Sequence, residues 1–181
     1  MPVDPAVRAA THADVGSILQ IYAPYVAGTS ISFECNVPSP EEMGRRIAAE
    51  PRLPWLVAET PSEVLGYAYA YPHADRAAYR WTVNCSVYVG AERQRSGIGR
   101  LLYVRLLDEL RELGYVCAVA RITLPNQPSV RLHESVGFTP AGKLKGVGFK
   151  GGKWHDVGLW ELHLATHPAV PREPTSWAPP G

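Results

Sequence analysis

The stretch SVYVGAERQRSGIGRLLYVRLLDELREL, residues 86–113, decides the fold of this chain. The apolar run Val87–Val89 predicts the end of a strand, and leucines spaced about 3.6 residues apart predict a helix after the second glycine of the loop. The predicted apolar face of that helix comprises Leu101, Leu102, Val104, Leu106, Leu107, Leu110 and Leu113. A strand that turns into a helix through glycines leaves backbone N–H groups unpaired at the positive end of the helix dipole. The loop over residues 94–99 therefore predicts an anion site.

Three arginines surround this loop: Arg93, Arg95 and Arg100. They indicate that the ligand is a phosphate or pyrophosphate. No Gly-Lys-Ser/Thr follows the glycines, which argues against an NTP-hydrolysing loop. The three-glycine dinucleotide pattern with an acid about twenty residues later is also missing. The alternative interpretation is a turn that the glycines permit, with solvated arginines.

Length and composition indicate one ordinary globular domain. The chain has 181 residues, 46% hydrophobic and 19% charged, with a net charge of +1. This balance argues against a nucleic-acid partner, which requires a basic excess. The three cysteines, Cys35, Cys85 and Cys117, are odd in number and far apart, so no disulfide framework is expected. With no signal-peptide pattern and no membrane-length apolar run, we expect a cytoplasmic protein without a membrane partner.

The remaining patterns predict an α/β (α+β) fold in a single domain over residues 1–165. Strands are predicted at Val7–Ala10, Leu53–Thr60, Val64–Tyr71, Tyr79–Val89 and Val116–Ile122, with two more within Phe138–Leu164; helices are predicted within Thr11–Gly28, from Ser39, through 98–113 and from Pro125 to Gly137. The strand–helix–strand order in the middle predicts a parallel pair. The expected sheet is mixed and mostly antiparallel, with helices on both faces. The Pro-rich tail, residues 166–181, is expected to be disordered.

Four segments resemble one family in order and spacing: YAYPHADRAAYRWT, SVYVGAERQRSGIGRLLY, LPNQPSVRLHESVGF and GFKGGKWHDVGLWEL. The chain resembles the GNAT superfamily and, within it, the phosphinothricin and methionine sulfoximine N-acetyltransferases, from Val7 to about Leu164. The resemblance implies a GNAT fold whose central parallel strands splay to admit acetyl-CoA. It also implies a homodimer without a metal, which acetylates the α-amino group of a small acidic amino-acid analogue by direct transfer in a ternary complex.

The same resemblance assigns the acetyl-CoA site. Backbone groups of Val87 and Val89 would pair with the pantetheine amides, and the Val89 N–H would stabilise the oxyanion. The loop residues Gln94, Arg95, Ser96, Gly97, Ile98, Gly99 and Arg100 would hold the pyrophosphate. Asn126 and Ser129 would reach the CoA arm, although Asn126 also suits a polar turn. His133 would protonate the departing thiolate, unless it serves only in capping or packing.

On the acceptor side, Arg76 matches the family arginine that receives the acidic group of the substrate. Tyr79 lies near it in the matching order, and Phe33 fits an aromatic wall of the pocket. Lys150 and Trp154 belong to the segment that lines the pocket mouth and helps to build the dimer. The alternatives are a solvated loop arginine at position 76, a core phenylalanine at position 33 and ordinary sheet packing at position 154.

One position departs from the family. Relatives carry a glutamate three residues before the VYV triplet, taken as the base that deprotonates the substrate ammonium, and Asn84 stands there in this chain. A neutral amide cannot accept that proton, although it can orient a water. Glu34, Asp75 or His73 would have to substitute. Two alternatives therefore stay open: a GNAT enzyme for a different amine, and a catalytically weak acetyl-CoA-binding module.

Overall fold

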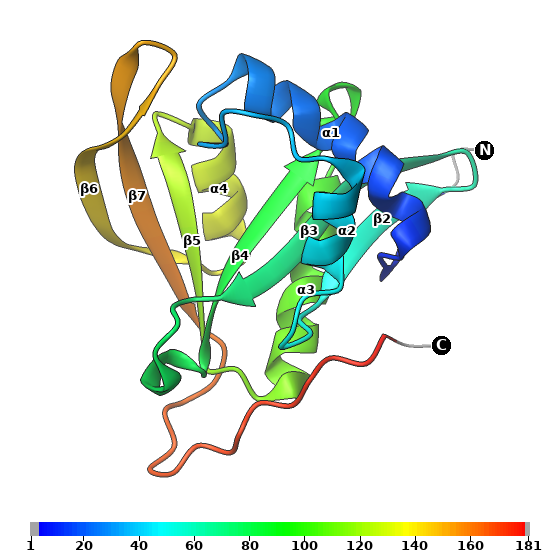
Figure 1. The fold of residues 1–181 in the computed structure, drawn as a ribbon. Coiled ribbons are helices and arrows are strands. Elements are labelled where there is room, and N and C mark those ends of the chain that lie inside the picture. Colours follow the sequence, from blue (N-terminus) through cyan, green and yellow to red (C-terminus); the bar gives the residue numbers. More distant parts are fainter. Residues whose placement is uncertain (1–3, 180–181) are drawn as a thin grey trace.

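The computed structural model describes residues 4–179 and shows a seven-stranded sheet in the order β1-β2-β3-β4-β5-β7-β6 (Figure 1). The strands are β1 (Ala6–Ala9), β2 (Trp55–Thr60), β3 (Glu63–Pro72), β4 (Thr82–Val89), β5 (Cys117–Leu124), β6 (Thr139–Lys150) and β7 (Lys153–His163). The helices are α1 (Val15–Gly28), α2 (Pro40–Ile47), α3 (Ile98–Leu113) and α4 (Gln127–Ser135). Within the described residues, only β4 and β5 pair in parallel, and the other strand pairs are antiparallel. The predicted mixed sheet is confirmed.

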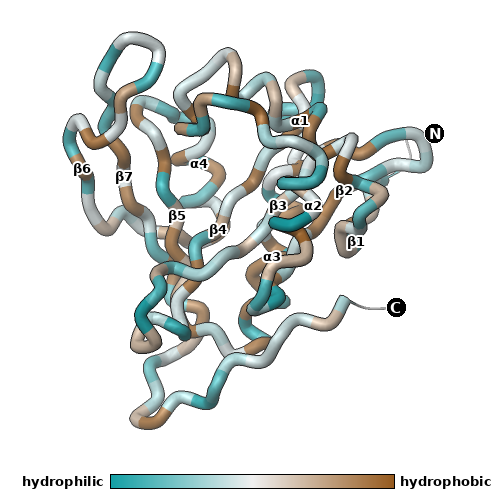
Figure 2. The backbone as a smooth tube through the Cα atoms, in the orientation of Figure 1, coloured by the Kyte–Doolittle hydropathy of each residue, from teal (hydrophilic) through white to brown (hydrophobic). Residues whose placement is uncertain are grey.

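Two apolar cores lie on opposite faces of this sheet. One joins α3 to the inner sides of β2–β5, with Leu102, Leu106 and Leu110 fully buried. The other lies under α1 and α2, around Ile18 and Met43. Figure 2 shows the hydrophobic residues concentrated along the central strands. Helices therefore cover both faces, as the alternation of strand side chains requires.

The helix boundaries follow local chemistry. Ser39 begins α2 because its hydroxyl accepts a hydrogen bond from the Glu42 N–H at 3.2 Å, next to a proline in the first turn. Gly114 ends α3 in a left-handed conformation with φ of 92°, which favours glycine at that position.

Two local predictions are wrong. Residues 79–81 are not strand, because a 3-10 helix at Ala77–Tyr79 precedes β4. Leu101 and Val104 do not belong to the buried face of α3: they are 39% and 40% exposed, and Tyr103 is buried instead. The helical period fits either set, and only the direction of approach of the sheet selects between them.

The Pro-rich tail differs from the expected disorder, because it packs along α3 through residue 179. The Trp177 side chain is 4% exposed and its Nε1 donates to Glu109 at 3.1 Å. The Arg172 guanidinium donates to the carbonyl of Glu112, and Trp81 Nε1 donates to the carbonyl of Arg172. Proline lowers helix and strand propensity but leaves an extended chain free to dock. The tail therefore joins the same folded unit as the sheet.

We predict that Trp177→Ala destabilises the protein by about 3 kcal/mol, because it removes a buried indole and orphans its hydrogen bond. Urea unfolding of the full chain measures this. Val170→Ala is the matched control in the same tail, since Val170 is 86% exposed, and it should change stability by less than about 0.5 kcal/mol. Equal stability of the two variants would show that the tail is not docked.

Candidate active site

A notch opens in the middle of the sheet where β4 and β5 separate. Their parallel pairing covers only Thr82–Asn84 against Cys117–Val119, although both strands continue for five more residues. The Gly90 N–H donates to Leu65 on the β3 side. Because backbone groups of successive residues point to opposite edges of a strand, those of Val87 and Val89 face the notch. The notch thus presents unpaired strand groups to a ligand.

One of these strand groups is already occupied. The Tyr25 hydroxyl of α1 donates to the carbonyl of Val89 at 2.6 Å, and Gln94 Nε2 donates to the same tyrosine oxygen at 3.1 Å. The Val89 N–H keeps its direction toward the notch. Gln94 was expected to bind the pyrophosphate. In the structure its side chain also links the loop to α1 through Tyr25.

The loop before α3 has the geometry of an anion site. Arg95 and Gly97 adopt positive φ values of 62° and 87°, and Gly97 caps the helix without any side-chain cap. No acidic residue lies in the first turn of α3. A Cβ on Gly99 would approach Leu132 of α4 to 2.9 Å, so glycine permits the close contact of α3 and α4. The N–H groups of Ile98 to Arg100 are left for an external acceptor.

Asn126 and Ser129 lie on the far side of the notch, at the start of α4. Asn126 caps this helix, because its Oδ1 accepts from the Ser129 N–H at 3.3 Å. Both residues line a small cavity of about 50 Å³ in the notch, together with Val87, Arg121 and His133. The sequence offered a polar turn as the alternative for Asn126, and the structure shows a helix cap at that position. The cap uses only Oδ1, so the amide nitrogen of Asn126 remains for the ligand side.

His133 is placed differently from the prediction. Its ring is 4% exposed; Nδ1 lies 2.7 Å from the Ser129 carbonyl, and Nε2 lies 2.7 Å from the Tyr103 hydroxyl. A carbonyl only accepts, so Nδ1 carries the hydrogen and Nε2 accepts from Tyr103. Burial lowers the pKa of His133, which keeps the ring neutral at pH 7. In this arrangement His133 has no free proton to give to a thiolate.

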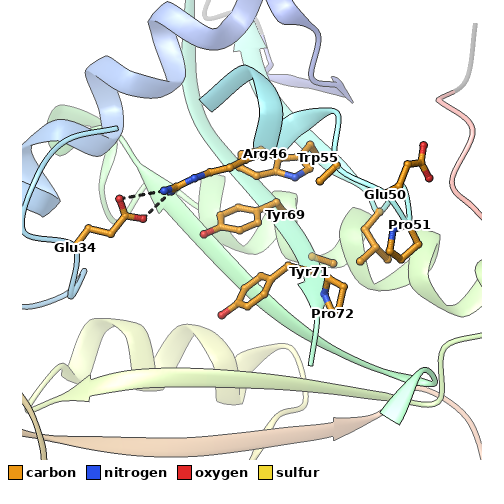
Figure 3. Close-up of a pocket in the computed structure, with 11 residues that line it drawn as sticks. Glu34, Arg46, Glu50, Pro51, Trp55, Tyr69, Tyr71 and Pro72 are labelled. Carbon is orange, nitrogen blue, oxygen red and sulfur yellow. Dashed lines mark hydrogen bonds and ion pairs between the residues drawn. The ribbon is translucent and has the colours of Figure 1, made fainter. Parts of the chain in front are cut away.

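A larger cavity of about 380 Å³ opens beside the notch, on the face covered by α1 and α2 (Figure 3). It is lined by Glu34, Arg46, Glu50, Pro51, Leu53, Trp55, Tyr69, Tyr71 and Pro72, among others. In Figure 3 the two tyrosine rings lie side by side, with Arg46 above them and Glu34 to one side. Arg46 is held by Glu34 at 2.6 Å and by Glu42 at 2.9 Å, so its charge is compensated within the protein.

This cavity shares a face of the sheet with Asn84. Tyr71 of β3 stands directly opposite Asn84 of β4, and Tyr69 stands opposite Ser86. Directly paired residues of antiparallel strands project to the same side. Burial raises the pKa of both Tyr69 and Tyr71, so their hydroxyls stay protonated at pH 7. The cavity is thus an aromatic, hydrogen-bonding space directly next to the notch.

Lys150 lines neither cavity. Its Nζ donates to the carbonyls of Val26, Ser32 and Glu34 at 2.7, 2.7 and 2.8 Å. All three N–H donors of the ammonium are used, so Lys150 holds the loop after α1 and does not face a substrate. Residues 31–34 of that loop reach both sites, because Ile31 lines the notch cavity and Glu34 the larger one. The expected substrate contact of Lys150 is therefore replaced by a positioning contact.

The other predicted acceptor residues are more exposed. Phe33 is 39% exposed and packs its ring on Gly148 of β6, where a Cβ would overlap it. Tyr79, 47% exposed, faces His73 with ring centroids 5.5 Å apart, and Arg76 lies exposed just before it without an ion pair in the described residues. Trp154, 67% exposed, packs against Phe149 and lines neither cavity.

Sequence reasoning missed several residues that line the two cavities. These are Tyr103, Arg121, Arg46, Tyr69 and Tyr71. A signal existed for Arg121, which is a lone charge inside the apolar run CAVARITL. The alternating tyrosines of YAYAY also place one aromatic set on one face of a strand. Tyr103 had no signal, since its direction depends on the rotation of α3.

Comparison with known proteins identifies the family. Residues 7–159 match the acetyltransferase (GNAT) domain family. The chain is 42% identical over 167 residues to phosphinothricin N-acetyltransferase from Streptomyces viridochromogenes, covering 92% of this chain and 91% of the relative. It is 34% identical to L-methionine sulfoximine/L-methionine sulfone acetyltransferase from Salmonella typhimurium, covering 90% and 96% of the two chains.

A solved structure agrees. The chain matches a GNAT superfamily phosphinothricin acetyltransferase from Sinorhizobium meliloti in complex with acetyl-CoA, with a TM-score of 0.89 and 33% identity over 94% of this chain and 95% of the other. The chain belongs to the GNAT acetyltransferase family. It is an N-acetyltransferase, and acetyl-CoA is its co-substrate. The notch and the anion loop fit that co-substrate. The notch offers unpaired backbone groups of β4, and the loop offers the free N–H groups at the start of α3.

Residues 4–179 contain no group of three or more His, Cys, Asp or Glu side chains that could hold a metal ion. Within the same residues, no helix combines the length and the apolarity that crossing a membrane requires.

We predict that Lys150→Met raises KM for the amine several-fold and leaves KM for acetyl-CoA unchanged. The substitution leaves the loop carbonyls without their donor and loosens the loop that carries Glu34, which lines the larger cavity. Lys153→Met is the control, because Lys153 is exposed in the same hairpin. Steady-state kinetics with each substrate varied in turn distinguishes the two variants. A direct substrate contact of Lys150 would instead show as loss of preference for acidic amines.

Proposed function

We propose that the enzyme acetylates the α-amino group of a small acidic amino-acid analogue such as phosphinothricin or methionine sulfoximine. The observation that carries this proposal is the 380 Å³ cavity on the same sheet face as Asn84, directly beside the notch. Its size suits one small molecule and not a protein chain. The names of the two relatives supply the substrate class.

The transfer is proposed to be direct, in a ternary complex. A two-step route would need a nucleophile that first takes the acetyl group. Cys85 is 3% exposed, and burial raises its pKa far above neutrality; burial also raises the pKa of Cys117. A protonated, buried thiol is a poor nucleophile. The amine would therefore attack acetyl-CoA itself, with the Val89 N–H directed toward the oxyanion.

Arg76 is proposed to bind the acidic group of the substrate. Among residues 4–179 it forms no ion pair, it lies on the exposed loop between β3 and β4, and the resemblance matches it to the family arginine. Guanidinium binds carboxylate or phosphinate through two parallel hydrogen bonds. Arg121, which lines the notch cavity, is a second cation on this side.

We propose that the enzyme is a cytoplasmic homodimer, as the resemblance to the family implies. Exposed apolar side chains occur on the edge strand β6 and its neighbour β7, namely Leu144, Val147, Phe149 and Trp154, and the last two are in contact; such an edge suits a homodimer interface. Sedimentation velocity measures this directly. All three cysteines are free, which agrees with a reducing compartment such as the cytoplasm.

The first test is release of free thiol from acetyl-CoA with phosphinothricin, methionine sulfoximine and a panel of neutral amines. We predict turnover of the acidic analogues by the wild type. Strong turnover of another amine alone would favour a different acceptor. The weak-module alternative predicts acetyl-CoA binding without turnover, and a gain of about 10²-fold in Asn84→Glu, because a carboxylate base would be restored.

A second test addresses Arg76. We predict that Arg76→Gln raises KM for the acidic analogues at least ten-fold, because a charge-assisted pair of hydrogen bonds is lost. The KM for acetyl-CoA should not change. Arg111→Gln is the control, since Arg111 pairs only with Asp108 at the far end of α3. Equal kinetics of the two variants would remove Arg76 from the substrate site.

A further inference from the structure

Asn84 is buried and bound on three sides. It is 2% exposed, and its Nδ2 donates to the carbonyls of Pro72 at 3.1 Å and His73 at 3.4 Å. Its Oδ1 lies 3.2 Å from Nδ1 of the His73 ring. The amide thus joins the middle of β4 to the first residue after β3. It lies on the sheet face that carries the acceptor cavity, opposite Tyr71.

These contacts determine which ring nitrogen of His73 carries the hydrogen. Carbonyl oxygens only accept, so the end of the amide that faces Pro72 and His73 must be the NH₂ group. The other end, Oδ1, can only accept, and therefore Nδ1 of His73 must donate. A neutral imidazole carries one hydrogen, so Nε2 holds a lone pair. In the described residues Nε2 has no hydrogen-bond partner.

The other groups near this site are paired, protonated or not oriented by a hydrogen bond. Glu34 is paired with Arg46 at 2.6 Å. Tyr71 and Tyr69 stay protonated because burial raises their pKa. The ring of Tyr79 and the amide of Asn84 contact His73, and Tyr71 stands opposite Asn84. Asp75 and Arg76 belong to the same loop as His73; both are exposed, and among the described residues no hydrogen bond orients the Asp75 carboxylate.

We infer that His73 is the general base that deprotonates the substrate ammonium, and that Asn84 is its positioning residue. This inference rests on the proposed acetyl transfer and deepens it. The position where relatives carry a carboxylate here carries an amide, and the amide holds an imidazole whose open nitrogen points away from it. The proposed base therefore belongs to the loop after β3 and not to β4, and one hydrogen bond connects it to position 84.

The protons balance in this scheme. The lone pair of His73 Nε2 takes one proton from the ammonium, directly or through a water, and the imidazolium later releases it to solvent. The free amine forms the C–N bond to the acetyl carbon. The C–S bond then breaks with its electron pair on sulfur, and the second amine proton reaches the thiolate. The products are the amide, CoA thiol and one proton.

The test is His73→Gln in the full-length protein, assayed by thiol release from pH 6.5 to 9.5. At pH 7 we expect kcat/KM for the amine to fall by about 10²-fold or more. The difference in kcat/KM between His73→Gln and the wild type should become smaller as pH rises, because an α-amino group with a pKa of about 8 or above then loses its proton to solvent. Acetyl-CoA affinity should be unchanged. His163→Gln, an exposed histidine at the end of β7, is the control and should match the wild type.

Two further variants separate a base from a structural residue. His73→Ala should regain activity when imidazole is added, which a packing defect would not do. Asn84→Glu should lose activity, because its carboxylate would face the carbonyls of Pro72 and His73; a gain would overturn the inference in favour of the restored carboxylate. A wild-type rate in His73→Gln, or an equal deficit at every pH, would also overturn it. An inactive wild type would instead refute the proposed function.

Discussion

The separation of β4 from β5 is the constraint on which the site depends. Each strand keeps a full antiparallel partner on its outer side: β3 pairs along all of β4, and β7 along all of β5. Each strand is therefore held without the other, and their facing edges can part after Asn84 and Val119. Unpaired backbone groups within a sheet are costly unless they find partners. A ligand with amides in series supplies those partners.

The loops around the larger cavity are held by contacts from distant parts of the chain. Lys150 of β6 holds the loop after α1 through three carbonyls, and Asn84 of β4 holds the loop after β3 through two. The tail adds a third contact, because Trp177 bonds to the carbonyl of Arg52, next to the rim of the larger cavity. In each case one polar group fixes a loop that has little regular structure of its own.

The sequence predicted much of the fold because local rules and tertiary structure agree there. The β2–β3 hairpin, the Ser39 cap and the parallel pair around α3 follow from alternation, capping and connection rules. The glycine loop predicted an anion site, and the backbone of Arg95 and Gly97 has that geometry. Prediction failed for the buried face of α3, for the tail and for Lys150. There the side-chain type permits several roles, and the neighbour selects one.

The sequence by itself predicted the anion site, because strand, glycine loop and helix are contiguous and their chemistry is local. The resemblance of four segments to one family implied the family and the co-substrate. It also showed that position 84 lacks a carboxylate. The tertiary structure alone decided which group stands beside that amide. The orientation of Asn84 follows from two backbone carbonyls, and the tautomer of His73 follows from Asn84. Which atom donates and which accepts between Asn84 and the end of β3 depends on residues that only the fold brings together. No local pattern in the sequence could therefore predict it.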